Sequence, residues 1–102
     1  MAATRKKVRY AVVGLGWFAQ AAVLPAFANA RATAELVALV TGDDEKAREL
    51  GKRYDVPVVG YQDYGDFLKA GGADAVYVVT PNGKHREHVE IAARAGVHVL
   101  CE

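Results

Sequence analysis

The stretch VRYAVVGLGWFA, residues 8–19, decides the fold that the rest of the chain is expected to adopt. It begins with β-branched and apolar residues, which favour a strand, and passes into the pattern G-x-G-x-x-A. Gly14 permits a tight turn, and Gly16 lets the backbone approach a pyrophosphate, because a side chain there would collide with it. Ala19 lets the next helix pack close to the strand. The stretch therefore predicts a strand, a phosphate-binding turn and a helix whose first N–H groups face the phosphates.

Further apolar runs follow this stretch, at residues 35–41, 56–60, 74–80 and 97–101. They are continuously apolar rather than alternating, which is typical of parallel strands covered on both faces. Segments with helical patterns separate them, so strands and helices alternate along the whole chain. Such alternation predicts an α/β fold with right-handed crossovers. We therefore expect a doubly wound parallel sheet of about five strands, the Rossmann fold, over residues 8–102.

The expected helices have recognisable boundaries. Pro25 should break or restart the helix at 18–29, because proline lacks an N–H group and clashes with the preceding turn. Asp43 or Asp44 can cap a second helix that runs to about residue 54, and Asp44 is a good candidate. Asp63 can cap a third helix, and Asn82 or Gly83 precedes a fourth. Glycines are expected to end the last two helices: Gly71 and Gly72 for one, Gly96 for the other.

Composition excludes several classes of protein. The chain has 102 residues, enough for one domain, with 52% hydrophobic and 25% charged residues. A net charge of +1 gives no electrostatic signal for nucleic acid or an anionic membrane. Cys101 is the single cysteine, which excludes an internal disulfide and a multi-cysteine metal site. No apolar run reaches the ~20 residues of a membrane-spanning helix. We expect a cytoplasmic protein in which residues 1–7 form a flexible arm.

The end of the second strand bears on the choice of dinucleotide. An enzyme selective for NAD usually places an acid there, where it binds the ribose hydroxyls. This chain has Thr41 at that position, followed by Gly42 and, in the next helix, Lys46 and Arg48. A hydroxyl, an open backbone and positive charge suit a 2′-phosphate, which favours NADP. Asp43 and Asp44 leave NAD as the alternative, although helix capping also accounts for them.

The fourth strand leads into VTPNGKH, residues 79–85. Ligands of doubly wound sheets lie outside the carboxyl ends of the strands, where Thr80, Pro81 and Asn82 are expected. His85 and His88 are three residues apart and could share a helix face, but the chain offers no obvious third metal ligand. A packed or exposed helix histidine is the favoured interpretation of His88. The sequence therefore predicts no metal site, and it contains no convincing general base.

The segments VGLGWFA, VTGDDEKA, VYVVTPNGKH and AGVHVLCE, in this order, resemble the Gfo/Idh/MocA family of sugar and polyol oxidoreductases. The resemblance covers the chain from Val8 onward and is strongest to the NADP-using glucose–fructose oxidoreductase branch. It implies NADP as cofactor and a sugar or polyol substrate in the full-length protein. It also implies the cofactor-binding residues. Gly14, Gly16 and the backbone of Leu15, Trp17 and Phe18 would hold the pyrophosphate, and Thr41, Gly42 and Lys46 would hold the adenosine ribose phosphate. The middle of the cofactor would be lined by Thr80, Pro81, Asn82 and His85, and Glu102 would reach toward the nicotinamide ribose.

The same resemblance implies that more protein belongs after Glu102. Members of the family continue this strand with Lys-Pro, and the lysine serves catalysis. We therefore expect the last strand and the substrate domain to be absent, the chain as given to be catalytically inactive, and the sheet edge at 97–101 to favour a homo-oligomer. The alternative function is a stand-alone nucleotide-binding or sensor module without catalysis.

Overall fold

The computed structural model describes residues 7–16, 19–30, 32–80 and 82–101. The elements follow one another as β1 (Val8–Val13), a π-helical turn η1 (Ala19–Val23), α1 (Leu24–Asn29), β2 (Ala34–Val40), α2 (Asp44–Tyr54), β3 (Val58–Val59), α3 (Tyr61–Lys69), β4 (Ala75–Val78), α4 (Asn82–Arg94) and β5 (His98–Cys101). Strands and helices alternate as the sequence predicts. Every described helix is too short or too polar to cross a membrane.

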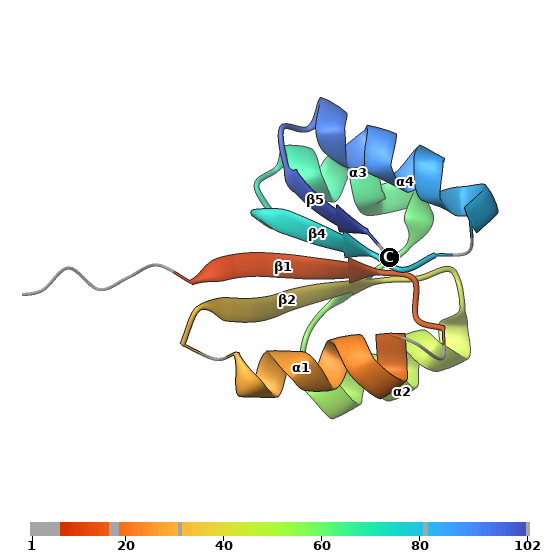
Figure 1. Ribbon diagram of the computed structural model, residues 1–102. Coiled ribbons are helices and arrows are strands. Elements are labelled where there is room, and N and C mark those ends of the chain that lie inside the picture. The colour runs from red at the N-terminus through yellow and green to blue at the C-terminus, as the bar shows by residue number, and fades with distance from the viewer. Residues whose placement is uncertain (1–6, 17–18, 31, 81, 102) are drawn as a thin grey trace, which may run out of the picture.

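The strands form one parallel sheet in the order β3-β2-β1-β4-β5. The chain builds outward from β1 to β3, then crosses back to place β4 on the other side of β1. The carboxyl ends of all five strands meet at one edge, at the right of Figure 1. The doubly wound α/β fold expected from the sequence is confirmed, and its reversal of strand order lies between β1 and β4, where ligands of such sheets bind.

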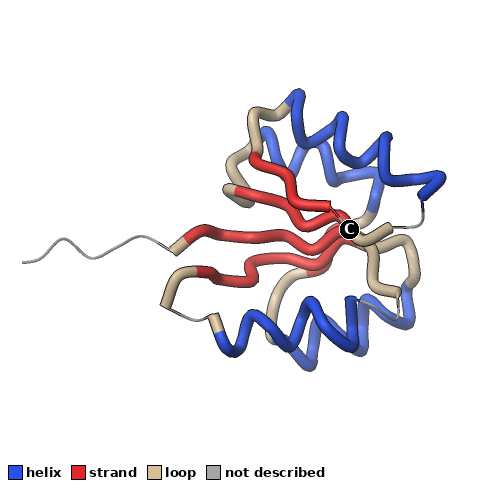
Figure 2. Tube along the Cα trace, viewed as in Figure 1, coloured by secondary structure: helices blue, strands red, loops and turns tan. Residues whose placement is uncertain are grey.

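Helices cover both faces of the sheet (Figures 1 and 2). α1 and α2 pack on one face over Val12 and Leu39, with Leu50 of α2 buried against them, while α3 and α4 pack on the other over Val13 and Val76. Neighbouring residues of one strand, such as Val12 and Val13, therefore serve different cores, and both are fully buried. Burial on both faces explains why the strands are continuously apolar in sequence.

The helix boundaries confirm some expectations and correct others. α1 begins directly after the π-helical turn and carries Pro25 in its first turn, which is the restart that proline predicts. Asp43, rather than the favoured Asp44, is the N-cap of α2 and accepts a hydrogen bond from the backbone N–H of Lys46. The N-cap of α3 is Gly60 rather than Asp63, which lies inside the first turn because the helix begins earlier than expected.

The other boundaries are close to expectation. Asn82 is the first residue of α4 rather than its predecessor. Gly71 and Gly96 have positive φ angles of 81° and 74° just after α3 and α4, which confirms them as helix ends.

An ion pair between Arg9 of β1 and Asp74, just before β4, joins these two strands at the amino-terminal edge of the sheet. The backbone N–H of Arg9 donates to Asp74 Oδ2 at 2.9 Å, and the Arg9 guanidinium lies 3.2 Å from Asp74 Oδ1. The backbone N–H of Asp74 donates in return to the carbonyl of Arg9 at 2.8 Å. This reciprocal contact aligns the start of β1 with the start of β4.

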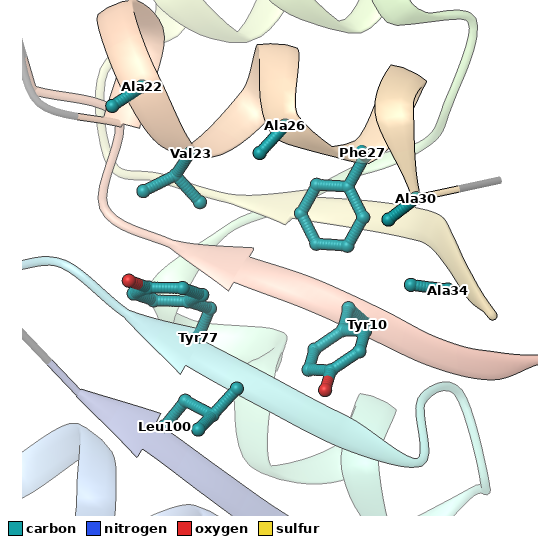
Figure 3. A pocket seen from close by; sticks show the side chains of 9 residues that line it. All are labelled: Tyr10, Ala22, Val23, Ala26, Phe27, Ala30, Ala34, Tyr77 and Leu100. Carbon is teal, nitrogen blue, oxygen red and sulfur yellow. The ribbon is translucent and has the colours of Figure 1, made fainter.

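One part of the sheet face beside α1 is open. A pocket of about 280 Å³ lies between α1 and the strands β1, β4 and β5, as Figure 3 shows. Phe27 reaches from α1 toward Tyr10 of β1, with the ring centroids 5.5 Å apart, while Tyr77 and Leu100 line the strand side. Leu100 is 47% exposed. Among the described strands β5 pairs with β4 alone, so both this face and the outer edge of β5 are open.

Candidate functional site

A groove of about 590 Å³ lies at the carboxyl ends of β1, β2 and β4, at the reversal of strand order. Its walls bring together residues from five different parts of the chain: Gly14, Leu15, Gly16, Thr41, Gly42, Asp43, Lys46, Tyr61, Val79 and Thr80. Most of the residues predicted from the sequence as a binding site are in this list. Trp17, Phe18, Pro81 and Glu102 lie outside the described residues, as do the side chains of Asn82 and His85 at the start of α4.

The glycine turn forms the floor of the groove. Gly14 has a φ of 94°, and its N–H donates to the carbonyl of Val40 at 2.9 Å, which ties the turn to β2. The side chain of Leu15 is buried in the core beneath α1, so the turn presents backbone to the groove. A Cβ on Gly16 would meet no described atom within 4 Å. The space in front of Gly16 is therefore open, as a site for a pyrophosphate requires.

A short chain of hydrogen bonds orders the end of β2. The hydroxyl oxygen of Thr41 accepts from the N–H of Asp43 at 3.1 Å, and the Asp43 carboxylate accepts from the N–H of Lys46 at 3.0 Å. Thr41 is buried, and its hydroxyl keeps its own hydrogen to donate to a ligand. Lys46, in the first turn of α2, lines the groove with a flexible side chain that ends in an ammonium group.

Tyr61 is a groove residue that the sequence analysis missed. It is the first residue of α3, and its ring would lie 3.1 Å from a Cβ on Gly42. The space beside Gly42, expected to hold a phosphate, is therefore occupied by this ring. The signal was present in the sequence, because Tyr61 follows the short third strand and so must lie at the carboxyl edge of the sheet.

His88 lies buried behind the groove. Its ring stacks on Tyr61 at 4.8 Å with an interplanar angle of 19°, and meets the edge of Tyr64 at 5.8 Å. Its Nδ1 and the hydroxyl of Thr80 are 3.3 Å apart, and the imidazole tautomer decides which of them donates. Of the two interpretations left open for His88, packed or exposed, the structure gives the packed one. Among the described residues there is no cluster of potential ligands that could hold a metal ion.

The electrostatics of the groove suit an anion. Tyr61 and Tyr64 carry no charge at physiological pH, and burial raises the pKa of both phenols further above their usual value. Lys46 supplies a positive charge, Thr41 and Thr80 supply hydroxyls, and the glycine turn supplies backbone. An elongated ligand with phosphate groups matches these donors along the groove.

Comparison with known proteins gives a family match over residues 8–102, to the Gfo/Idh/MocA model described as an oxidoreductase family with an NAD-binding Rossmann fold. D-xylose 1-dehydrogenase [NADP(+)] of Haloarcula marismortui is 35% identical over 102 residues, which cover 98% of this chain and 28% of that enzyme.

Solved structures give the same result. The aldose–aldose oxidoreductase of Caulobacter crescentus, complexed with glycerol, superimposes with a TM-score of 0.87 at 39% identity, covering 94% of this chain and 29% of that one. The scyllo-inositol dehydrogenase of Lactobacillus casei, with bound NAD(H) and scyllo-inositol, gives a TM-score of 0.81 at 27% identity, covering 94% and 28%. The chain thus spans less than a third of the length of these relatives.

Proposed function

The chain belongs to the Gfo/Idh/MocA family of oxidoreductases and carries its NAD(P)-binding Rossmann domain, and from this premise we propose that its groove binds NADP(H) in preference to NAD(H). The observation that supports the preference for NADP(H) is that Thr41 and Lys46 line the same groove as the glycine turn. A carboxylate at this place would accept hydrogen bonds from the ribose hydroxyls and repel a phosphate. The threonine hydroxyl and the lysine ammonium group can instead donate hydrogen bonds to a phosphate.

The proposed orientation of the dinucleotide follows from the walls of the groove. The pyrophosphate lies in front of Gly16, where the structure leaves space. The adenosine ribose and its 2′-phosphate lie at the end of β2, by Thr41, Lys46 and the backbone of Gly42, while the Tyr61 ring fills the Cβ side of Gly42. The nicotinamide half passes Thr80 toward the end of β4. By the family resemblance we also assign Trp17 and Phe18 to the pyrophosphate, and Pro81, Asn82, His85 and Glu102 to the nicotinamide half.

Asp43 is the residue that would support NAD instead. One of its carboxylate oxygens accepts the N–H of Lys46 and so caps α2. Helix capping therefore explains why an acidic residue stands at position 43, without assigning it to the ribose hydroxyls. Asp43 nevertheless lines the groove, and its charge reduces the advantage that Lys46 gives to a 2′-phosphate.

We propose that the full-length protein oxidises or reduces a sugar or polyol. The relatives above are named as dehydrogenases or oxidoreductases of such compounds. The nicotinamide, when bound, supplies the hydride chemistry, and the described residues bind and orient it. We propose that residues 8–102 form the nucleotide-binding domain. The substrate site would then lie in a part of the protein that corresponds to the remaining length of these relatives, and this chain alone should show no turnover.

Titration of the 102-residue chain with NADPH and with NADH tests the proposal. Calorimetry should give a dissociation constant for both, with NADPH the tighter ligand. Tighter binding of NADH would make Asp43 the ribose ligand and overturn the preference for NADP. No heat and no thermal stabilisation by either cofactor at millimolar concentration would overturn the binding function itself.

A further inference from the structure

His88 has no surface on the groove, yet it contacts two residues that do. Its side chain is 4% exposed, and it lies behind Tyr61 and Thr80, which both line the groove. Tyr61 comes from the start of α3, Thr80 follows β4, and His88 lies in α4. One buried imidazole therefore joins three separate elements beneath the site.

The contact with Tyr61 fixes the wall at the β2 side. The imidazole lies against the face of the phenol ring, and the Cδ2–Cε2 edge of that ring lies against Gly42. The N-cap of α3 is Gly60, whose lack of a side chain gives no capping hydrogen bond to steady this turn. Tyr61 is 38% exposed, so the stacked imidazole of His88 restricts a ring that is open to solvent on part of its surface.

The contact with Thr80 fixes the wall at the β4 side. The methyl group of Thr80 points at Gly14 and its hydroxyl points at His88. A rotation about χ1 that turns the hydroxyl away from His88 would remove the contact between this hydroxyl and Nδ1. The histidine therefore favours one rotamer of a buried threonine that packs on the phosphate-binding turn.

α3 also holds His88 itself in place. The hydroxyl of Tyr64 donates to the backbone carbonyl of His88 at 3.0 Å, and the Tyr64 ring packs edge-on against the imidazole. Both phenols are protonated at neutral pH, as tyrosines ordinarily are, and burial raises the pKa of each further from neutrality. The imidazole of His88 thus contacts the uncharged rings of Tyr61 and Tyr64 and the hydroxyl of Thr80.

From this geometry we infer that His88 is a positioning residue for the nucleotide site: it sets the Tyr61 ring and the Thr80 side chain at the orientations in which the groove accepts the dinucleotide. The inference rests on the proposed function, because it assigns His88 to the binding of NADP(H). It makes His88 act through its neighbours, without contact to the cofactor.

Substitutions of His88 can separate its two contacts. His88→Asn keeps an amide near the place of Nδ1 for Thr80 but removes the stacked ring, whereas His88→Phe keeps a ring for Tyr61 but removes the hydrogen bond. We expect His88→Ala to weaken NADPH binding about tenfold, and each of the other two variants to weaken it about threefold. Adenosine 2′,5′-bisphosphate, which probes the Tyr61 side alone, should bind His88→Phe within about twofold of wild type and His88→Asn less tightly.

Val89→Ala is the matched control. Val89 is the next residue of α4 and packs into the core beneath the sheet, away from the groove. This variant should lower the melting temperature while leaving the NADPH dissociation constant within about twofold of wild type. If His88→Ala fails to fold, the Asn and Phe variants carry the comparison with Val89→Ala.

Three outcomes would overturn the inference. If wild type binds NADPH and the His88 variants bind equally well, His88 positions nothing. If the His88 variants lose no more NADPH affinity than Val89→Ala does for the same drop in melting temperature, the role of His88 is structural alone. If wild type binds neither NADPH nor NADH, the proposed function fails and this inference fails with it.

Discussion

The side chain of Thr80 lies against the Cα of Gly14, so that a Cβ added to residue 14 would be 2.8 Å from Thr80 Cγ2 and 3.0 Å from its backbone nitrogen. The glycine turn at the end of β1 and the loop after β4 are therefore in direct contact. The positive φ angle of 94° makes residue 14 unsuitable for other amino acids for a second reason.

Gly14→Ala should destabilise the fold by about 2–4 kcal/mol, because it adds a backbone collision to an unfavourable dihedral angle. Gly71→Ala is the control, since Gly71 has a φ of 81° but open space around its Cβ direction. It should cost only about 1–2 kcal/mol. Urea unfolding measures both, and equal losses would show that the contact with Thr80 relaxes freely.

Gly16→Val should abolish most cofactor binding while leaving the melting temperature unchanged. The Cβ of the new side chain meets no described protein atom within 4 Å, and the side chain occupies the proposed place of the pyrophosphate. Loss of two charge-assisted hydrogen bonds corresponds to a roughly 100-fold weaker affinity. Calorimetric titration with NADPH measures it, and an unchanged dissociation constant would remove the pyrophosphate from this turn.

Lys46→Ala should weaken NADPH by roughly 10- to 150-fold and leave NADH nearly unchanged, because the ammonium group contacts the 2′-phosphate that NADH lacks. Lys52→Ala removes an equal charge from the exposed last turn of the same helix and should affect neither cofactor. A parallel loss of both cofactors in Lys46→Ala would argue that this lysine does not distinguish them.

Thr41→Asp should reverse the preference toward NADH. The new carboxylate can accept the N–H of Asp43, as the threonine oxygen does at 3.1 Å, so the turn is expected to survive. It also accepts from the ribose hydroxyls and repels a 2′-phosphate, which should weaken NADPH by about tenfold. The ratio of the two dissociation constants is the measurement, with Thr41→Ser as the control that keeps the hydroxyl.

Tyr64 should make the fold sensitive to alkali. Burial raises its pKa in the folded state, so above pH ~10 the unfolded chain loses a proton that the folded chain retains. Stability should then fall by about 1.4 kcal/mol per pH unit from this group as the pH rises above that value. Tyr64→Phe should cost about 1 kcal/mol at pH 7, through loss of the hydrogen bond to His88, but make the alkaline fall shallower.

The alternation of strand-like and helix-like segments, together with the glycine turn, was enough to predict most of the fold. Gly14 could be assigned from its pattern because a single backbone conformation fits a strand that turns so abruptly into a helix. Thr41 and Lys46 could be placed together because both follow the second strand at short distance. These are local relationships, and local relationships are what sequence spacing encodes.

Contacts between side chains of different helices and strands could not be predicted from the spacing of residues in the sequence. Nothing in the residues around position 61 shows that its ring fills the space beside Gly42, or that His88 stacks behind it. The choice of Asp43 over Asp44 as the cap of α2 also depended on context, because the Thr41 hydroxyl engages the N–H of Asp43 and holds it outside the helix. Such choices are settled by tertiary packing rather than by the preference of a residue type.

The strand order has a consequence for how this domain is made. β1 is the first strand to leave the ribosome, yet it lies in the middle of the sheet. On one side it can pair with β2 as soon as that strand emerges, so β1, β2 and β3 can form a half-sheet on the nascent chain. Its other side pairs with β4, and Arg9 meets Asp74 across 65 residues of sequence. Until β4 has been synthesised, β1 lacks its partner on that side, so the central strand of the finished sheet is at first an edge strand, a position that favours pairing with other chains.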